Sequence, residues 1–388
     1  MSWPLVALKD CCTVVGGATP KREVESYWDS QDIPWVTPKD ISKIKSIYLD
    51  DAPEYISQKG FDSCAAHKLP EGSLLLTSRA PIGNVAITTR ELCTNQGFKS
   101  LVPSESVDIK YLYFCMLYSA ERLENEGNGA TFKEVSKKVV EAFKIPLPPL
   151  ETQKKIAAVL EKADQLRKDC KLLEQELNSL AQSVFIDMFG DVRSNSFNSK
   201  KVKFDDIFEI NSKLVDPRLP EFENLPHIGP EHLEKRTGRI LPYRTAREDA
   251  LVSGKFNFQK GCVLFSKIRP NLKKVAIPEF SGLCSADMYP LEAVDGVSTR
   301  EFIWGLILSD AFDDYLETLP SRANIPKINR KELAAFEFYL PDLRDQKAYS
   351  KKLAKIQEQL KQNACLYQET ENNFNALMQK AFKGKLTL

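Results

Sequence analysis

The sequence predicts an α+β protein in which one module, a mixed α/β globular domain followed by a long helix, occurs twice. Three features predict this fold: blocks of sequence recur about 190 residues apart, each copy contains short apolar runs separated by glycine and proline, and each copy ends in a heptad pattern of apolar residues. We expect a first globular domain at 1–149, a central helix at 150–190, a second globular domain at 191–341 and a C-terminal helix at 342–388.

The repeat consists of five blocks that occur in the same order in both copies. The matched pairs are Asp32–Ile41 with Asn224–Leu233, Gly72–Thr77 with Gly261–Ser266, Val85–Ile87 with Val275–Ile277, Leu92–Thr94 with Leu283–Ser285, and Phe143–Lys154 with Phe336–Lys347. Collinear matches with a nearly constant offset are hard to obtain by chance. The chain is therefore expected to contain an internal duplication with pseudo-twofold symmetry.

The composition is that of a folded protein with no strong charge bias. The 388 residues include 54 Lys and Arg against 53 Asp and Glu, so the net charge is +1 and any contact with nucleic acid must come from a local patch. No apolar run of about 18 residues is present, which argues against a membrane span. The nine cysteines include no Cys-x-x-Cys pair, so we expect reduced thiols in the cytoplasm rather than disulfides or a zinc site.

Within each globular domain, the apolar runs predict strands and a packed helix. Gly72–Thr77 and Asn84–Thr88 are typical of strands, and Lys110–Leu117 is typical of a helix that packs on them. Arg300–Leu308 is the counterpart of that helix in the second copy. Each domain is thus expected to mix α and β structure.

A proline-rich segment and then a long heptad pattern follow each globular domain. The prolines within Pro146–Pro149 and Leu340–Asp342 end a strand ladder and precede a helix start. The first helix, about 36 residues and about 54 Å long, has a seam of Ile156, Val159, Ala163, Leu166, Cys170, Leu173, Leu177, Leu180 and Val184. The second seam contains Tyr349, Leu353, Ile356, Leu360, Asn363, Tyr367, Thr370, Phe374, Leu377 and Ala381.

The two seams are expected to pair with each other as an antiparallel coiled coil within one molecule. A narrow apolar stripe requires a partner, and a duplicated module supplies one around a pseudo-twofold axis. Asn363 occupies the second seam where Cys170 occupies the first, and a polar seam residue fixes the register at a cost in stability. The alternative is a coiled coil between copies of the chain.

Two similar but unequal domains at the ends of a rod suit a long ligand with two separated marks, and double-stranded DNA is such a ligand. Lys255–Lys274 contains six basic residues and no acidic residue, and its loop Ser266–Lys274 lies between two predicted strands. Arg and Lys in that loop can neutralise phosphates or bind guanine, and Asn271 can pair with adenine. The alternative interpretation of such a charge run is a solvated surface.

The matching loop of the first copy, Thr77–Asn84, is less basic but contains Arg79. A second candidate loop, Asn128–Lys133, matches Ser321–Lys327 and also precedes a proline-rich segment. The DNA-binding candidates are therefore Thr37, Lys39, Ser78, Arg79, Asn84, Thr131 and Lys133 in the first copy, and Lys267, Arg269, Asn271, Lys273, Lys274, Arg322, Asn324 and Lys327 in the second.

The chain lacks the signatures of several enzyme classes. It has no Gly-x4-Gly-Lys-Ser/Thr loop, no Asn/Asp-Pro-Pro-aromatic tetrapeptide of amino-methyltransferases and no Gly-x-Gly after a strand. Pro341–Lys347 resembles a nuclease signature only superficially, because its acids lie at a helix start, where acids are expected for capping. His227 and His232 have no histidine counterparts in the first copy, so we expect packing or surface roles for them. No catalytic residue, metal ligand or cofactor site is expected in this chain.

Several motifs of the first copy are similar to those of the DNA-specificity (S) subunit of type I restriction–modification enzymes. They are Gly16–Pro20, Asp32–Ile41, Gly129–Lys133 and Ile145–Ala157, and the last precedes the spacer helix of that family. The resemblance covers essentially the whole chain, and the combination of motifs with the duplication is specific. The second copy departs from the pattern, for example at Gly229, and resembles another specificity subgroup.

The resemblance implies that each globular domain is a target recognition domain for one half of a split, asymmetric DNA sequence. It implies that the helices set the gap between the halves and bind two methyltransferase subunits, which carry S-adenosylmethionine and methylate adenine. Restriction subunits that use ATP and Mg²⁺ would complete the enzyme, and the S subunit itself would be non-catalytic. The alternative is a duplicated coiled-coil scaffold without DNA specificity.

Overall fold

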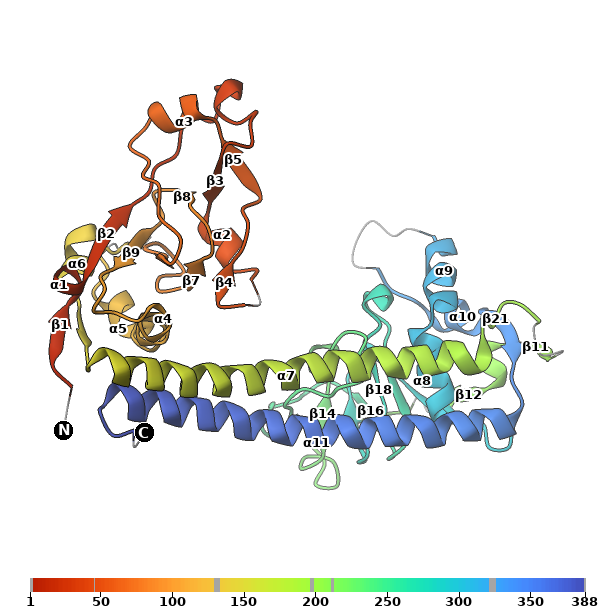
Figure 1. Ribbon diagram of the computed structural model, residues 1–388. Helices are drawn as coiled ribbons and strands as arrows, with labels where there is room; N and C mark the ends of the chain where they lie inside the picture. Colours follow the sequence, from red (N-terminus) through yellow and green to blue (C-terminus); the bar gives the residue numbers. More distant parts are fainter. Residues whose placement is uncertain are drawn as a thin grey trace. The chain divides into compact units, whose positions relative to one another are not determined.

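The computed structural model describes residues 3–44, 46–128, 133–195, 199–210, 213–320 and 326–386 (Figure 1). The chain divides into two compact units, Met1–Asp169 with Leu366–Leu388, and Cys170–Cys365. Each unit consists of one globular domain and one half of each long helix, whereas the sequence predicted four consecutive segments. Across the described ranges, no helix is long and apolar enough to cross a membrane, and no group of three or more His, Cys, Asp or Glu side chains could hold a metal ion.

The described residues of the first unit form three sheets. The strand orders are β2-β9-β6-β7-β4, β5-β3-β8 and β1-β10. The elements are β1 (Leu5–Ala7), α1 (Leu8–Cys11), β2 (Cys12–Gly16), a 3-10 turn (Glu25–Tyr27), β3 (Ile33–Val36), α2 (Pro38–Ile41), β4 (Tyr48–Leu49), β5 (Glu54–Ile56), α3 (Gln58–Asp62), β6 (Leu74–Leu76), β7 (Val85–Thr88), β8 (Cys93–Thr94), β9 (Lys99–Pro103), α4 (Ile109–Tyr118), α5 (Ala120–Asn125), α6 (Lys137–Ala142), β10 (Lys144–Pro146), the start of α7 (Leu150–Phe189) and the end of α11 (Leu343–Phe382).

Three sheets also form within the described part of the second unit, with the orders β12-β20-β17-β18, β13-β16-β19-β14-β15 and β11-β21. Besides the remaining halves of α7 and α11, its elements are β11 (Lys200–Lys203), β12 (Phe208–Ile210), β13 (Leu214–Val215), β14 (Pro226–Ile228), β15 (Arg244–Thr245), β16 (Lys255–Phe258), β17 (Val263–Ser266), β18 (Val275–Ala276), β19 (Gly282–Cys284), β20 (Met288–Ala293), α8 (Arg300–Leu308), α9 (Asp310–Thr318), α10 (Arg330–Ala334), β21 (Glu337–Leu340) and 3-10 turns at Phe204–Asp206, Pro230–His232 and Pro270–Leu272.

The two units share a topology, which confirms the predicted fold class of duplicated α/β domains. The order β12-β20-β17-β18 repeats β2-β9-β6-β7, and the pair β11-β21 repeats β1-β10. The parallel pair β14 and β19 repeats the parallel pair β3 and β8. The strands predicted in the first copy contain β6 and β7, and the predicted packed helices are α4 and α8, whose inner residues are buried.

A buried glutamine fastens the start of each long helix to the globular domain before it. Gln153 Oε1 accepts a hydrogen bond from Asp108 N at 2.9 Å. Its Nε2 donates to Ser106 O at 3.0 Å and to Pro148 O at 2.8 Å. Gln346 makes the corresponding bonds in the second unit, to Thr299 N, Val297 O and Pro341 O. A buried amide is normally hydrogen-bonded. Because these bonds join the first turn of the long helix to main-chain groups of the globular domain, they hold the helix start in place on that domain.

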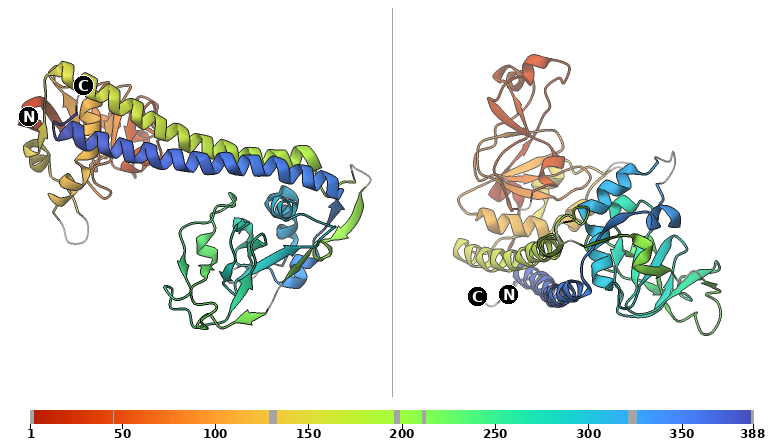
Figure 2. Two further views of the ribbon diagram at one scale, coloured as in Figure 1. Left: turned by 90° about the horizontal axis from the view of Figure 1, so that it is seen from below. Right: turned by 90° about the vertical axis from the view of Figure 1, so that its right-hand side faces the viewer.

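In the first unit, the start of α7 and the end of α11 lie side by side and run in opposite directions (Figures 1 and 2). Ile156 packs in the same core as Met378. Further along α7, Arg167 forms an ion pair with Glu371 at 3.2 Å and lies 4.3 Å from the ring centre of Phe374. Residue numbers rise on α7 as they fall on α11, so the pairing is antiparallel.

In the second unit, the end of α7 and the start of α11 are also antiparallel. The ring centres of Phe185 and Tyr349 are 5.5 Å apart. Asn363 Nδ2 donates a hydrogen bond to Cys170 O at 2.8 Å, and both residues are buried. These two residues occupy matching positions of the two copies, so equivalent turns of the two helices meet here.

The two ends of the described chain lie close together in the first unit (Figures 1 and 2). Trp3 Nε1 donates a hydrogen bond to Ala381 O at 3.0 Å, near the end of α11. Strand β1 pairs with β10, directly ahead of α7. The N-terminal segment therefore contacts both the strand that precedes α7 and the end of α11.

The buried face of α7 differs from the predicted seam. The predicted seam residues Val159, Leu166, Leu173 and Leu180 are 37%, 51%, 42% and 45% exposed. The seam residues that are buried are Ile156, Cys170, Leu177, Tyr349, Leu353, Ile356, Asn363, Phe374 and Ala381, while Ala163, Val184, Leu360, Tyr367, Thr370 and Leu377 are half-buried. Residues outside the predicted seam, such as Ala157, Leu160, Ala181 and Phe185, are buried instead. The reason is that α7 packs against a globular core as well as α11 in each unit, which turns its buried face away from a strict heptad stripe.

Candidate nucleic-acid interface

Three segments meet beside the loop that follows β6 in the first unit. Ser78 N donates to Gly97 O at 2.8 Å, and Val135 N donates to Ser78 O at 2.9 Å. Arg79 and Glu134 form an antiparallel bridge at the same place. The main chain thus joins the β6–β7 loop to the turn before β9 and to the segment before α6.

Two cations surround one carboxylate on this frame. Arg79 Nε lies 3.0 Å from Glu134 Oε2, and Lys99 Nζ lies 3.7 Å from Glu134 Oε1. Burial lowers the pKa of the Lys99 ammonium, and the Glu134 carboxylate acts in the opposite direction. Arg79 and Glu134 are exposed to a large extent, so this cluster is accessible to a ligand.

The second unit repeats the frame at matching positions. Lys267 N donates to Asp287 O at 3.0 Å, and Ile328 N donates to Lys267 O at 3.0 Å. Ile268 and Lys327 form the antiparallel bridge. The loop after β17 therefore meets the turn before β20 and the segment before α10, as in the first unit.

The second frame also places two cations near one carboxylate. Asp287 Oδ1 lies 3.6 Å from Lys267 Nζ and 3.8 Å from Lys327 Nζ. Arg269 and Asn271 are exposed on the adjoining loop, and Arg269 N donates to Pro326 O at 2.7 Å. These predicted contact residues lie together on the surface of the second domain.

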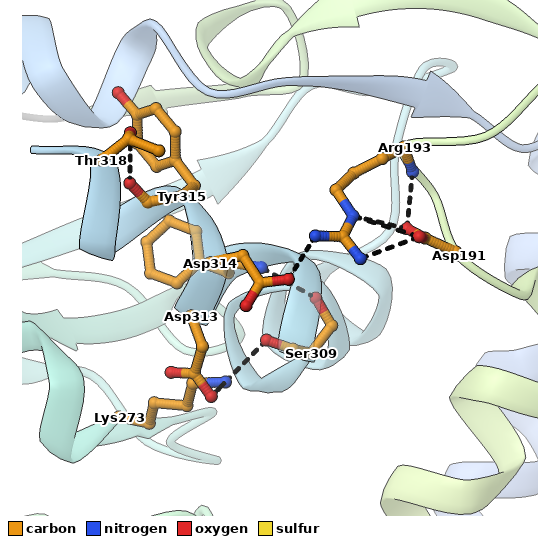
Figure 3. Close-up of polar contacts among 9 residues, drawn as sticks. Asp191, Arg193, Lys273, Ser309, Asp313, Asp314, Tyr315 and Thr318 are labelled. Atoms are coloured by element: carbon orange, nitrogen blue, oxygen red, sulfur yellow. Dashed lines mark hydrogen bonds and ion pairs between the residues drawn. The ribbon is translucent and has the colours of Figure 1, made fainter.

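Lys273 was predicted to bind DNA, but the structure places it in the protein interior (Figure 3). Its Nζ donates to Leu308 O at 2.8 Å and to Ser309 O at 2.6 Å. The same atom lies 2.7 Å from Asp313 Oδ2. Burial lowers the pKa of the Lys273 ammonium, and Asp313 opposes that shift. Because a cation is stabilised by the free carbonyls at a helix end, Lys273 anchors the loop to the end of α8 and does not face a ligand.

Helix α9 is held from two sides (Figure 3). Asp313 forms an ion pair with Lys273 of the loop between β17 and β18, and Asp314 forms one with Arg193, which follows the end of α7. Arg193 Nε also lies 2.8 Å from Asp191 Oδ1. In the second unit, this helix therefore links the end of α7 to the loop that carries Arg269.

Several other predicted contact residues are engaged within the protein. Ser78 is buried, and its hydroxyl accepts from Lys99 Nζ at 3.4 Å, so the prediction of a ligand contact by this side chain is not supported. Lys274 is half-buried and donates to Pro230 O at 2.5 Å. Asn84 is half-buried at the end of its loop. Lys133 is exposed. The remaining candidates of these segments, Thr131, Arg322 and Asn324, lie outside the described residues.

The matched proline blocks form the same cap with different side chains. Thr37 N donates to Asp40 Oδ2 at 2.8 Å, and the Thr37 hydroxyl donates to the same oxygen at 2.6 Å. In the second copy, Gly229 N donates to His232 Nδ1 at 2.9 Å. Thr37 and His232 therefore have structural partners, and Lys39 is exposed on α2.

His227 is buried on β14, and its Nδ1 lies 2.9 Å from Asp249 Oδ2. Its partner is structural, as expected of a packing residue. All nine cysteines are free thiols.

Sequence reasoning missed Lys99, Glu134 and Asp287, which complete the two clusters. It matched the segment Asn128–Lys133 with Ser321–Lys327, and the bridges and main-chain hydrogen bonds show that Lys327 is the counterpart of Glu134. The signal that could have found Glu134 is the constant offset between the copies near the Phe143 and Phe336 block. The predicted contact residues were cations, amides and hydroxyls, so Asp287, a carboxylate, was not among them.

Known proteins resemble this chain in both copies of the module. A family model of the type I restriction modification DNA specificity domain matches residues 2–181 and 198–371. The chain is 33% identical over 244 residues to the type I restriction enzyme MjaIX specificity subunit of Methanocaldococcus jannaschii, a match that covers 62% of this chain and 54% of that relative. This match therefore spans little more than half of the relative's length.

Two further comparisons cover most of the chain. The type I restriction enzyme EcoDI specificity subunit of Escherichia coli is 28% identical over 323 residues, which are 72% of this chain and 71% of that relative. The crystal structure of the S subunit of a type I system from M. genitalium has a TM-score of 0.60 with 14% identity, and covers 98% of this chain and 96% of that chain. The structural likeness supports the fold, and the family model matches most of the sequence. The chain therefore belongs to the family of type I restriction–modification DNA specificity domains and contains two of them.

Proposed function

We propose that this chain is the DNA-reading specificity subunit of a type I restriction–modification enzyme, and that each domain reads one half of a split, asymmetric sequence. The observation that carries this proposal is the shared backbone frame with two different sets of charged side chains. A conserved frame positions a domain on DNA in one way, whereas different side chains select different bases. Two domains with different specificities therefore suit a DNA site with two different halves.

The chain is proposed to act without catalysis of its own and to bring methyltransferase subunits to the site. Exposed apolar residues on α7 support a surface for partner helices, because a helix with an unpaired apolar stripe packs well against other helices. They are Val159 and Leu166 in the first unit, and Leu172, Leu173, Leu180 and Ile186 in the second. Two methyltransferase subunits would carry S-adenosylmethionine, and restriction subunits would use ATP and Mg²⁺.

The decisive experiment is co-expression of the chain with an adenine methyltransferase subunit of a type I system, followed by mapping of methylated adenines in the host genome. We expect a motif of two unlike halves separated by a fixed gap. Methylation at a continuous, unsplit motif, or a gap that varies from site to site, would contradict the proposal.

The partner surface is tested in the same cells. Leu166→Glu and Leu173→Glu should abolish methylation without unfolding the chain, because both side chains are already in contact with water. Lys162→Glu, on the same helix and also exposed, is the matched control and should leave methylation unchanged. If the two leucine variants methylate as well as the Lys162→Glu control, α7 is not the docking surface for the methyltransferase subunits.

The loop arginines provide a test of base reading. Arg79→Ala should relax specificity at one position of the first half-site and Arg269→Ala at one position of the second, each with a loss of about 1–3 kcal/mol if the side chain binds guanine. Selection from a randomised duplex library by the assembled complex measures this. Equal weakening on every sequence would instead identify a phosphate contact.

A further inference from the structure

We propose that Glu134 and Asp287 are specificity-determining residues, each of which accepts a hydrogen bond from the exocyclic amino group of a cytosine or adenine in its half-site. This inference rests on the proposed function and extends it from cations to carboxylates. Both residues lie at the centre of the clusters described above, and both were outside the set of contacts that the sequence predicted.

The two carboxylates occupy the same kind of cluster but stand on different segments of the frame. Glu134 lies on the segment before α6, and its counterpart in the second domain is the cation Lys327. Asp287 lies on the turn before β20, and its counterpart in the first domain is Gly97, since both carbonyls accept the equivalent main-chain hydrogen bond. The acid therefore lies on a different segment of the frame in each copy, while the main-chain contacts of the frame are the same.

Stability does not account for these acids. The Glu134 side chain is 39% exposed and that of Asp287 is 41% exposed. The N–O distances from Asp287 to its two lysines are 3.6 and 3.8 Å, too long for good hydrogen bonds. Glu134 is closer to its partner, with Oε2 3.0 Å from Arg79 Nε, but both side chains of that pair are exposed, and exposed ion pairs add little to the stability of a fold.

A carboxylate on a surface that approaches DNA opposes binding, because it repels the phosphates. Its place there is explained if it meets a hydrogen-bond donor on a base edge. In the major groove those donors are the amino groups at N4 of cytosine and N6 of adenine, and Asp and Glu accept from cytosine N4. In the free protein, the neighbouring cations keep each carboxylate paired, and these cations are then available for phosphates or guanine when the base takes their place.

The different positions of the two acids affect recognition directly. Since the acid lies on the bridge segment in the first domain and on the turn between β19 and β20 in the second, the base with the amino group should occupy a different place in each half-site. Two domains with the same main-chain frame would in this way recognise two different half-site sequences.

The test is selection of binding sites from a duplex library with two randomised halves, using the complex assembled with methyltransferase subunits. Glu134→Ala should lower discrimination at one position of the first half-site at least ten-fold and leave the second half-site unchanged. Asp287→Ala should do the reverse. Loss of the negative charge should also leave binding to unrelated DNA as tight as before or tighter.

Two matched controls separate a role in base reading from the loss of any surface acid. Glu91 pairs with Lys68 at 3.0 Å in the first unit, and Glu337 pairs with Lys201 at 2.7 Å in the second. The alanine variants Glu91→Ala and Glu337→Ala should select the same half-site sequences as the unchanged chain. Glu134→Gln retains the shape and one acceptor but adds a donor, so it should move the preference at that position toward adenine; thermal unfolding should be unchanged for all variants.

The outcomes distinguish this inference from the proposed function. Suppose that the unchanged complex selects two half-site sequences and that both alanine variants select the same sequences with equal discrimination. The carboxylates then make no base-specific contact, although the chain still recognises DNA. A uniform loss of affinity on all sequences would likewise overturn the inference and would assign the acids to holding the cations in place. If the unchanged complex prefers no sequence, the proposed function fails, and the inference fails with it.

Discussion

The loops that precede β7 and β18 occupy matching places in the two copies, but they are anchored by different means. In the first copy, the Thr77 hydroxyl donates to Pro81 O at 2.7 Å and accepts from Asn84 N at 2.9 Å, so the loop is closed by its own residues. In the second, the buried Lys273 ammonium ties the loop to the end of α8. A shared backbone frame therefore does not require a shared anchor, and a basic residue in a loop can belong to the anchor rather than to the ligand surface.

The largest effect is expected from removal of the buried cation in the second loop. Lys273→Met would leave Asp313 and two helix-end carbonyls without this partner, and should lower the free energy of unfolding by about 3 kcal/mol. Urea unfolding followed by circular dichroism measures the loss. Lys260→Met, at an exposed lysine of the same unit, should change stability by no more than about 0.5 kcal/mol. Similar losses for both variants would show that Lys273 is not an anchor.

The next largest effect concerns a feature that the copies share. Gln153→Leu and Gln346→Leu each remove a buried amide that makes three hydrogen bonds to main-chain groups, and each should lower the free energy of unfolding by about 2–3 kcal/mol. Because the two glutamines make equivalent hydrogen bonds, we expect the two losses to agree to within about 1 kcal/mol. If only one of the two variants is destabilised, the buried glutamine of the other copy does not stabilise the fold.

A smaller effect is expected in the loop of the first copy. Gly83 has a φ of +89°, and a Cβ placed there would lie 2.7 Å from Ala120 Cβ, so Gly83→Ala combines backbone strain with a clash against α5. The expected loss is about 2 kcal/mol. Gly72 has a φ of +77° with open space around it, and Gly72→Ala should therefore cost only about 1 kcal/mol. Thermal unfolding of the two variants isolates the packing contribution; equal losses would leave no role for the contact with Ala120.

The smallest effect concerns thiols at matching positions. Burial raises the pKa of Cys93 to about 12 and also raises the pKa of Cys284, so neither forms an appreciable thiolate at about pH 8. Cys365 is exposed on α11. A thiol reagent should modify Cys365 first and should not react with Cys93 or Cys284 until the chain unfolds. Modification of Cys365 alone should leave the free energy of unfolding unchanged. Early modification of Cys93 or Cys284, identified by peptide mass mapping, would contradict their place in the two cores.

The features that the sequence predicted well depend on local pattern. The duplication, the strands around Gly72–Thr77 and the packed helices α4 and α8 follow from apolar periodicity and from glycine and proline signals, which act over a few residues. The heptad pattern of α7 was less informative, since it contains two overlapping apolar stripes. Only the tertiary structure shows that Leu160 and Phe185 are buried, while Leu166 and Leu180 remain on the surface.

The candidate site was harder to predict because its members come from distant parts of the chain. Charge in the loop was visible, but the burial of Lys273 depends on where α8 ends, 35 residues further along the chain. Glu134 and Asp287 were missed because each acquires its surroundings from two other segments. The contacts of Arg79, Arg269 and Asn271 with DNA remain predictions.

The hydrogen bond from Trp3 to Ala381 has a consequence for the order of the modules along the gene. Because the first and last described elements already touch, a short linker could join them, and new ends could be opened in an exposed turn elsewhere. Such a circular permutant would retain the described contacts except those at the cut. The linear sequence of the two modules is therefore one of several equivalent ways to encode the same set of contacts.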